Sequence, residues 1–149
     1  MKENRYNMLL NTTHQNKEHK QIIRELVGTS FTLLKTFKLK GVGSKRMIIS
    51  QVSPNLEQII NKSSDINYAN LELRTEGILI YINKGLENFT WVIPYPQLVV
   101  FKGDELSLHA QGKFVRFKNN NMVRENKTFL NKMIEQKLIY EERYNFQDL

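Results

Sequence analysis

From residue 69 to about residue 118 the chain alternates apolar and polar residues in short runs separated by turn-forming residues. This alternation is typical of antiparallel strands with one buried face, where a correct register pairs apolar residues across neighbouring strands. Turns placed at residues 76–77, 85–88, 103–104 and 111–112 all satisfy this condition. The shared apolar face then consists of Leu71, Leu73, Ile80, Ile82, Trp91, Ile93, Val99, Phe101, Leu106, Leu108, Val115 and Phe117.

These turns also predict individual pairs across the strands. The pairs are Leu73 with Ile80, Ile82 with Trp91, Phe101 with Leu106, and Leu106 with Phe117. Because proline cannot donate a hydrogen bond to a ladder, Pro94 and Pro96 must interrupt the meander, which restarts at Leu98.

After residue 121 the apolar period changes from two to 3.6, which predicts an amphipathic helix over about residues 123–142. Its apolar stripe consists of Phe129, Leu130, Met133, Ile134 and Leu138. We expect this helix to pack on the apolar face of the meander and close it.

Upstream of the meander the chain predicts a helix over residues 15–27, with Gly28 as its C-terminal stop. Residues 31–40 are compatible with helix or strand, and the alternation at 36–40 favours a strand. Residues 41–44 would then be a loop that leads into a strand at 45–52. Ser53 and Pro54 are typical of a helix start, here over residues 54–62.

The predicted class is therefore α+β: an antiparallel β-meander closed by a C-terminal amphipathic helix, with an N-terminal helix. A chain of 149 residues with 40% apolar content suits one domain, assigned to residues 15–149. Residues 1–14 are assigned to an N-terminal arm, which is either frayed or docked on the domain. The absence of cysteine excludes a disulfide scaffold. No apolar run approaches the ~20 residues of a transmembrane segment, and we expect a cytoplasmic protein.

The second face of the meander also carries apolar residues. Some of this face should be covered, by the helix at 15–27, by the helix at 54–62 or by a second subunit, and cover from the same chain is favoured. In a homodimer the contact would be made by Tyr81, Val92 and Phe114.

The net charge of +7 lies entirely in the first third of the chain. Residues 35–46 hold Lys35 and four further basic residues and no acid. If 36–40 and 45–52 form a hairpin, a phosphate could be held by Lys38, Lys40, Lys45 and Arg46. A solvated basic face is the simpler interpretation of the same charge.

The meander, the strand end at residues 91–95 and the single C-terminal helix together resemble a bacterial pleckstrin-homology-like (PH-like) domain. The resemblance covers about residues 69–140, and extends to 31–52 if two further strands lie there. It implies a binding module for lipid headgroups, peptides or other proteins. Phosphoinositide-binding members place basic residues around the loop that joins the first two strands, where this chain would have Lys38, Lys40, Lys45 and Arg46. The alternating basic ending of that family motif is absent here.

Nucleic acid is the second ligand that the basic residues suggest, because Tyr6, Phe31 and Phe37 are interleaved with them and could stack on bases. Core packing explains Phe31 and Phe37 more simply.

Residues for catalysis or metal binding are not apparent in the sequence. His14 and His19 are five residues apart and do not share a helix face. His109 is expected opposite Phe114 as a structural residue, and the aspartates Asp65, Asp104 and Asp148 are isolated. We therefore expect a non-catalytic binding or adaptor module without a cofactor or metal, whose partner is a protein or an anionic ligand. Nucleic-acid binding and a homodimeric interaction module are the alternatives.

Overall fold

A computed structural model describes residues 8–63 and 66–147. Its centre is an eight-stranded antiparallel sheet in the order β1-β5-β4-β3-β2-β8-β7-β6. The strands are β1 (Leu9–Asn11), β2 (Met47–Val52), β3 (Tyr68–Leu73), β4 (Gly77–Lys84), β5 (Glu87–Pro94), β6 (Val99–Lys102), β7 (Leu106–Ala110) and β8 (Lys113–Phe117). The helical elements are α2 (Lys17–Val27), α3 (Leu33–Lys38), η1 (Pro54–Ile59), η2 (Tyr95–Gln97), α4 (Asn121–Glu125) and α5 (Lys127–Gln147). The α+β class, with an antiparallel meander and a C-terminal helix, is confirmed.

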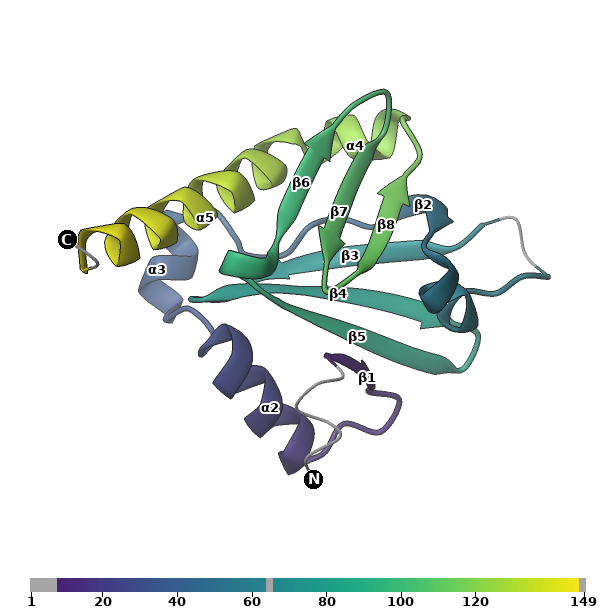
Figure 1. The fold of residues 1–149 in the computed structure, drawn as a ribbon, viewed down its shortest axis with the longest axis horizontal. Coiled ribbons are helices and arrows are strands. Elements are labelled where there is room, and N and C mark those ends of the chain that lie inside the picture. The colour runs from purple at the N-terminus through teal and green to yellow at the C-terminus, as the bar shows by residue number, and fades with distance from the viewer. Residues whose placement is uncertain (1–7, 64–65, 148–149) are drawn as a thin grey trace.

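Strand β2 belongs to both halves of the sheet. Met47 and Ile48 pair with β3, whereas Ile49, Gln51 and Val52 pair with β8, and the register shifts between Ile49 and Gln51. A bulge of this kind bends a strand. As a result β6, β7 and β8 cross over the strands of the other half, and the two halves enclose the apolar face between them (Figure 1).

The core lies between these halves. Ten of the twelve residues of the predicted apolar face are buried in it or packed against it, and Trp91 and Phe117 are among its largest fully buried side chains. From α5, Phe129, Leu130 and Met133 enter the same cluster. This confirms that the C-terminal helix closes the sheet. None of the helices in the described ranges is both long enough and apolar enough to cross a bilayer.

The predicted register is wrong by two residues in the first two hairpins. Leu71 pairs with Ile80, and Ile80 pairs with Trp91, around the two-residue turns 75–76 and 85–86. A shift of two keeps every side chain on its face, so the alternation alone does not distinguish the two registers. Gly77 is a strand residue rather than a turn residue, because a Cβ atom there would overlap the backbone of β5 and a side chain of α2.

At β6 the predicted register is wrong by one residue, which exchanges the two faces of that strand. Val100 pairs with Leu108 and faces the core, while Val99 and Phe101 are 48% and 53% exposed. The cause is a three-residue loop at 103–105 in place of a two-residue turn. The last hairpin is as predicted, with Leu106 opposite Phe117.

The N-terminal part of the chain covers the second face of the meander. Helix α2 places Ile22, Ile23 and Val27 in a second apolar cluster with Leu79 and Val92. Strand β1 pairs with β5 at the edge of the sheet, so residues 8–14 are docked, whereas residues 1–7 lie outside the described residues. Intrachain cover, the favoured alternative for this face, is provided by α2.

The predicted strand at residues 31–40 is wrong, since this segment contains α3. Thr32 accepts a hydrogen bond from the backbone N–H of Lys35 (3.2 Å) and caps the helix. Both edges of β2 are already used, by β3 and by β8, so no edge remains for a hairpin partner from 36–40. At the predicted helix 54–62, the chain forms the 3₁₀ helix η1, which buries Leu56 and Ile59.

Candidate binding surface

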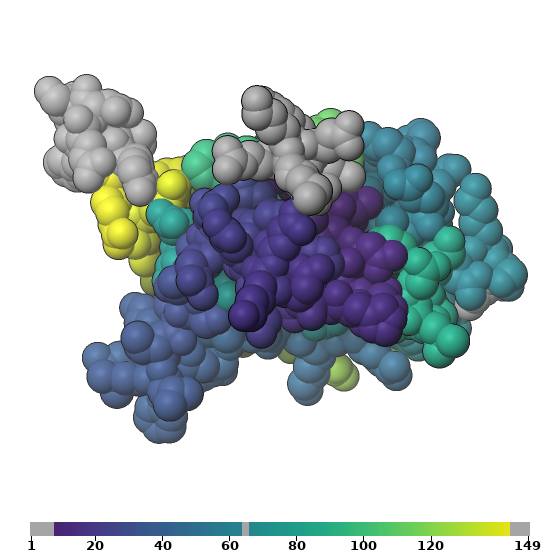
Figure 2. Space-filling model, turned by 90° about the horizontal axis from the view of Figure 1, so that it is seen from below, coloured from purple at the N-terminus to yellow at the C-terminus, as the bar shows by residue number. Residues whose placement is uncertain are grey.

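Helix α3 stands out from the body of the molecule and buries none of its side chains (Figure 2, where it lies in the blue segment that projects at the lower left). Leu33 is 91% exposed, Leu34 66% and Phe37 82%. At 3.6 residues per turn these three side chains share one side of the helix, while Lys35 and Lys38 follow on the adjoining side. An apolar stripe bordered by lysines therefore faces the solvent.

The C-terminal end of α3 is an unusual helix terminus. The N–H of Lys40 donates to Phe37 O (3.1 Å), and the N–H of Gly41 donates to Thr36 O (2.9 Å). This is the hydrogen-bond pattern of a Schellman motif, whose left-handed residue is normally glycine. Here the residue is Lys40, with φ of 59°. The chain therefore places a lysine where the backbone conformation favours glycine.

Lys132 of α5 fixes this terminus to the body of the protein. Its Nζ donates to Leu39 O (2.7 Å) and to Gly41 O (3.1 Å), where a cation also complements the helix dipole. Burial, together with the charge of the neighbouring Lys40, lowers the pKa of Lys132 from its ordinary value. Lys40 and Lys132 are thus close enough for their charges to interact.

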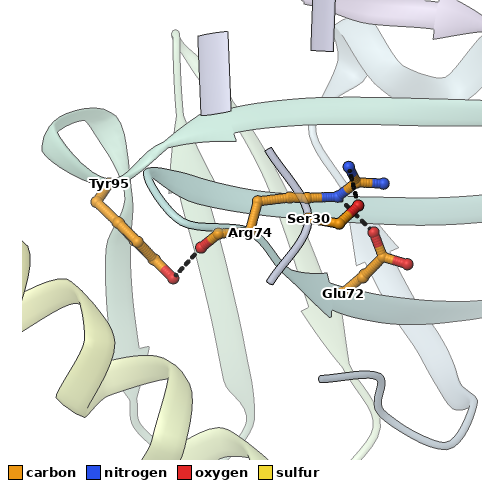
Figure 3. Close-up of polar contacts among 4 residues, drawn as sticks. All are labelled: Ser30, Glu72, Arg74 and Tyr95. Atoms are coloured by element: carbon orange, nitrogen blue, oxygen red, sulfur yellow. Dashed lines mark hydrogen bonds and ion pairs between the residues drawn. The ribbon is translucent and has the colours of Figure 1, made fainter. Parts of the chain in front are cut away.

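The segment that leads into α3 is fixed to the sheet by a cluster of polar contacts (Figure 3). Arg74, which directly follows β3, donates hydrogen bonds to Ser30 Oγ (2.8 Å) and to Glu72 Oε2 (2.6 Å). The carbonyl of Arg74 accepts a hydrogen bond from the hydroxyl of Tyr95 (3.0 Å). Both ends of α3 are therefore anchored, although the helix itself contributes nothing to the core.

The structure does not bring the four predicted anion-binding residues together. Lys38 and Lys40 lie at the end of α3, whereas residues 42–44 run beside β3 and carry Lys45 and Arg46 away from it. Consecutive residues entering a strand point to opposite faces. The guanidinium carbon of Arg46 lies 4.2 Å from the centre of the Tyr68 ring. The predicted hairpin between 36–40 and 45–52 is therefore wrong, and anion binding by these four residues stays a prediction.

Lys45 is held by a buried asparagine at the junction of α4 and α5. The N–H of Lys45 donates to Asn126 Oδ1 (2.9 Å), and Asn126 Nδ2 donates to Lys45 O (3.2 Å) and to Met122 O (2.9 Å). These contacts bind the start of β2 to the C-terminal helices.

The basic residues around α3 have no acidic partners within residues 8–63 and 66–147. Lys35, Lys38 and Lys40 are exposed and form no ion pair there; we call these three residues the α3 lysine cluster. Sequence reasoning did not identify Leu33 and Leu34, although Thr32 as a cap followed by Leu-Leu-x-x-Phe was a helix signal in that segment.

A second surface feature is an apolar groove between β6 and α5. It consists of two adjoining hollows of about 300 and 480 Å³ that share Val100, Lys102 and Ile134. Strand β6 ends the sheet, so one of its edges is unpaired within the described residues. Leu138, 52% exposed, extends the groove along α5.

The predicted dimer contact residues do not form one surface. Val92 is fully buried beneath α2, and Tyr81 packs against the same cluster. Phe114 lies on β8 and stacks on the ring of His109, with the two ring centres 5.2 Å apart. Val92 is therefore part of the protein's own core.

His109 is opposite Phe114, as predicted, and lies edge-on to Phe101. Burial and the neighbouring charge of Arg116 lower its pKa. No group of three His, Asp or Glu side chains that could hold a metal converges in the described part of the chain; Tyr6, Asp65 and Asp148 lie outside it.

Neither a protein-family model, nor a curated protein, nor a solved structure matches this chain.

Proposed function

We propose that this protein is a non-catalytic binding module that recognises an anionic ligand through the α3 lysine cluster. The observation that carries the proposal is the arrangement of Lys35 and Lys38 on a projecting, doubly anchored helix, with Lys40 in the turn that follows it and no acidic partner among the described residues. Unneutralised cations on a fixed element attract anions and raise their local concentration. Lys45 and Arg46 are not included, because they follow the segment 42–44 beside β3, where Asn126 holds the backbone of Lys45 and Arg46 lies over the ring of Tyr68.

We further propose that the fold is PH-like. The proposal is supported by the bent antiparallel sheet, whose two halves enclose one core, and by the single C-terminal helix that closes it. Members of that family are usually binding modules. The α3 lysine cluster precedes β2, the strand that both halves of the sheet share. It would therefore be a binding surface outside the loop that phosphoinositide-binding members use.

Binding can be measured by fluorescence polarisation with labelled inositol hexakisphosphate and labelled single-stranded DNA, at low and at physiological salt. We expect the triple variant Lys35→Gln, Lys38→Gln, Lys40→Gln to lose binding. The matched control is Lys17→Gln, Lys20→Gln, Arg24→Gln, which removes the same charge from the exposed side of α2. A second control is Lys45→Gln with Arg46→Gln.

Equal losses in the α3 variant and the α2 control would show that net charge alone is responsible and would refute the proposed site. Binding of the DNA that survives physiological salt, with none of the inositol phosphate, would favour the nucleic-acid alternative, for which Phe37 is exposed and available to stack.

The groove between β6 and α5 supports a second candidate function, the binding of an extended peptide. A peptide strand can pair with the free edge of β6 and place apolar side chains in the adjoining hollows. Panning a displayed peptide library should yield binders that Leu138→Asp abolishes and Leu86→Asp, at an exposed turn, retains. A dimer that Leu138→Asp dissociates in sedimentation experiments would instead identify a second copy of the chain as the occupant.

A further inference from the structure

We infer that α3 is a membrane anchor, whose apolar stripe enters the interface of an anionic lipid bilayer while the α3 lysine cluster binds the headgroups. This inference rests on the proposed function and specifies its ligand. It explains a feature that anion binding alone leaves unexplained, namely why Leu33, Leu34 and Phe37 face the solvent next to the lysines.

The exposure of these side chains is imposed by the fold. Ser30 holds the segment before α3 through Arg74, and Lys132 holds the turn after it. The remaining side of the helix faces the body through Thr36, which is half-buried. The helix cannot turn its apolar stripe inward without breaking these contacts, so the stripe is presented in a fixed orientation. A preformed element loses little conformational freedom when it binds.

The shape of the surface favours a bilayer over a folded protein. The hollows at the β6–α5 groove contain no residue of α3, and α3 itself is convex (Figure 2). A six-residue helix is about 9 Å long. Interfacial helices lie in the plane of the membrane and bury their apolar side ~5–10 Å deep. A convex apolar tip of this size can enter a deformable interface without a matching pocket.

The charge of the surface specifies the lipid. Lys35 and Lys38 border the apolar stripe, and Lys40 extends the cluster beyond the helix end. Basic residues beside an apolar stripe are characteristic of helices that bind anionic membrane surfaces, and each lysine near such a surface adds to the affinity. A neutral bilayer would leave the lysines without a partner.

The test is vesicle sedimentation with phosphatidylcholine alone and with phosphatidylcholine plus phosphatidylglycerol. We expect binding only to the anionic vesicles. The variant Leu33→Ser, Leu34→Ser, Phe37→Ser should bind them more than about tenfold more weakly, yet retain its affinity for inositol hexakisphosphate. A matched control removes three exposed apolar side chains elsewhere: Leu86→Ser, Val99→Ser and Phe101→Ser. It should bind as the parent does.

The outcomes separate this inference from the proposed function. If the α3 serine variant binds anionic vesicles as tightly as the parent, the anchor is refuted while anion binding stands. If the lysine variant keeps its affinity for both vesicles and inositol phosphate, the proposed function fails as well. Loss of a dimer in the serine variant, without any vesicle binding by the parent, would assign the stripe to a second copy and refute the anchor.

A spectroscopic test uses the fact that Trp91, the chain's single tryptophan, is fully buried. In Phe37→Trp, a new emission band should shift to shorter wavelength when anionic vesicles are added, and brominated lipid should quench it. Leu86→Trp, with its new indole at the exposed β4–β5 turn, should show neither change. An unshifted and unquenched Phe37→Trp band in sedimenting protein would overturn insertion.

Discussion

The buried side chain of Asn126 should be one of the most sensitive positions in the protein. It is 3% exposed and makes three hydrogen bonds, one accepted from the N–H of Lys45 and two donated to Lys45 O and Met122 O. In Asn126→Ala all three bonds are lost. At about 1 kcal/mol for each hydrogen bond, the loss should be about 3 kcal/mol of unfolding free energy. This is a large part of the ~5–15 kcal/mol typical of a domain.

The measurement is urea unfolding of the variant beside the parent, with Asn131→Ala as control. Asn131 is exposed on α5, and its replacement should change the unfolding free energy by less than about 0.5 kcal/mol. A loss below about 1 kcal/mol in Asn126→Ala would refute the reasoning, because it would mean that water or a shifted backbone replaces the hydrogen bonds.

Asn126→Asp tests the direction of the same hydrogen bonds. The new carboxylate could still accept from Lys45 N–H, but it would face two carbonyl oxygens without a hydrogen to donate. Protonation supplies one donor, so the pKa of this carboxyl group should be higher in the folded than in the unfolded protein. A raised folded-state pKa means that the variant regains stability as the pH falls through that value. If the unfolding free energy of Asn126→Asp stays below that of the parent by the same amount between pH 7 and pH 4, the assigned orientation of the Asn126 amide is contradicted.

Three further predictions follow from single residues. Gly77→Ala should destabilise the protein by more than about 2 kcal/mol in urea unfolding, because its Cβ would overlap β5 and α2. Gly43→Ala should be tolerated, because a Cβ atom there would meet only the carbonyl oxygen of Leu71, at 4.0 Å. Lys40→Gly should raise the unfolding free energy by up to about 1 kcal/mol, because glycine adopts the left-handed backbone conformation of this position without strain, and it should weaken binding of inositol hexakisphosphate. Lys40→Ala should weaken this binding without raising the unfolding free energy. Equal unfolding free energies of the two variants would contradict backbone strain at Lys40. Burial and a nearby arginine lower the pKa of His109 in the folded protein, so protonation favours the unfolded state. The unfolding free energy should therefore fall as the pH drops from about 6.5, the ordinary pKa of histidine, towards the lowered pKa of the folded protein. His109→Gln should reduce this pH dependence, and an unchanged pH profile would show that His109 is not its source.

The alternation of residues was sufficient to predict the buried face of β3, β4, β5, β7 and β8, but not that of β6, nor the register of the first two hairpins. A shift of two residues leaves the same side chains inside, so Leu71, Ile80 and Trp91 were assigned to the correct face with incorrect partners. The register depends on why residue 77 is a glycine. The glycine is needed because β5 and α2 approach its backbone closely, and not because it lies in a turn. That approach is a tertiary fact, and no local pattern encodes it.

The candidate site was less predictable because it depends on which strand edges are free. The alternation at residues 36–40 is a valid strand signal, yet β2 has β3 and β8 as neighbours and cannot accept a third. The segment therefore forms a helix, which separates Lys40 from Arg46 and exposes Phe37, a residue expected in the core. Phe31, predicted to pack in the core, does so at its margin.

The shared position of β2 has a consequence for how the protein is made. Its second half pairs with β8, more than sixty residues further along the chain, and Phe129, Leu130 and Met133 of α5, which complete the core, lie later still. During synthesis the apolar face of β3, β4 and β5 therefore emerges well before the strands that enclose it. Contacts so distant in sequence slow folding and leave apolar surface exposed in the interim. A nascent chain that stops after β5 would present an open apolar sheet, so we expect this protein to depend on chaperone protection until α5 has left the ribosome.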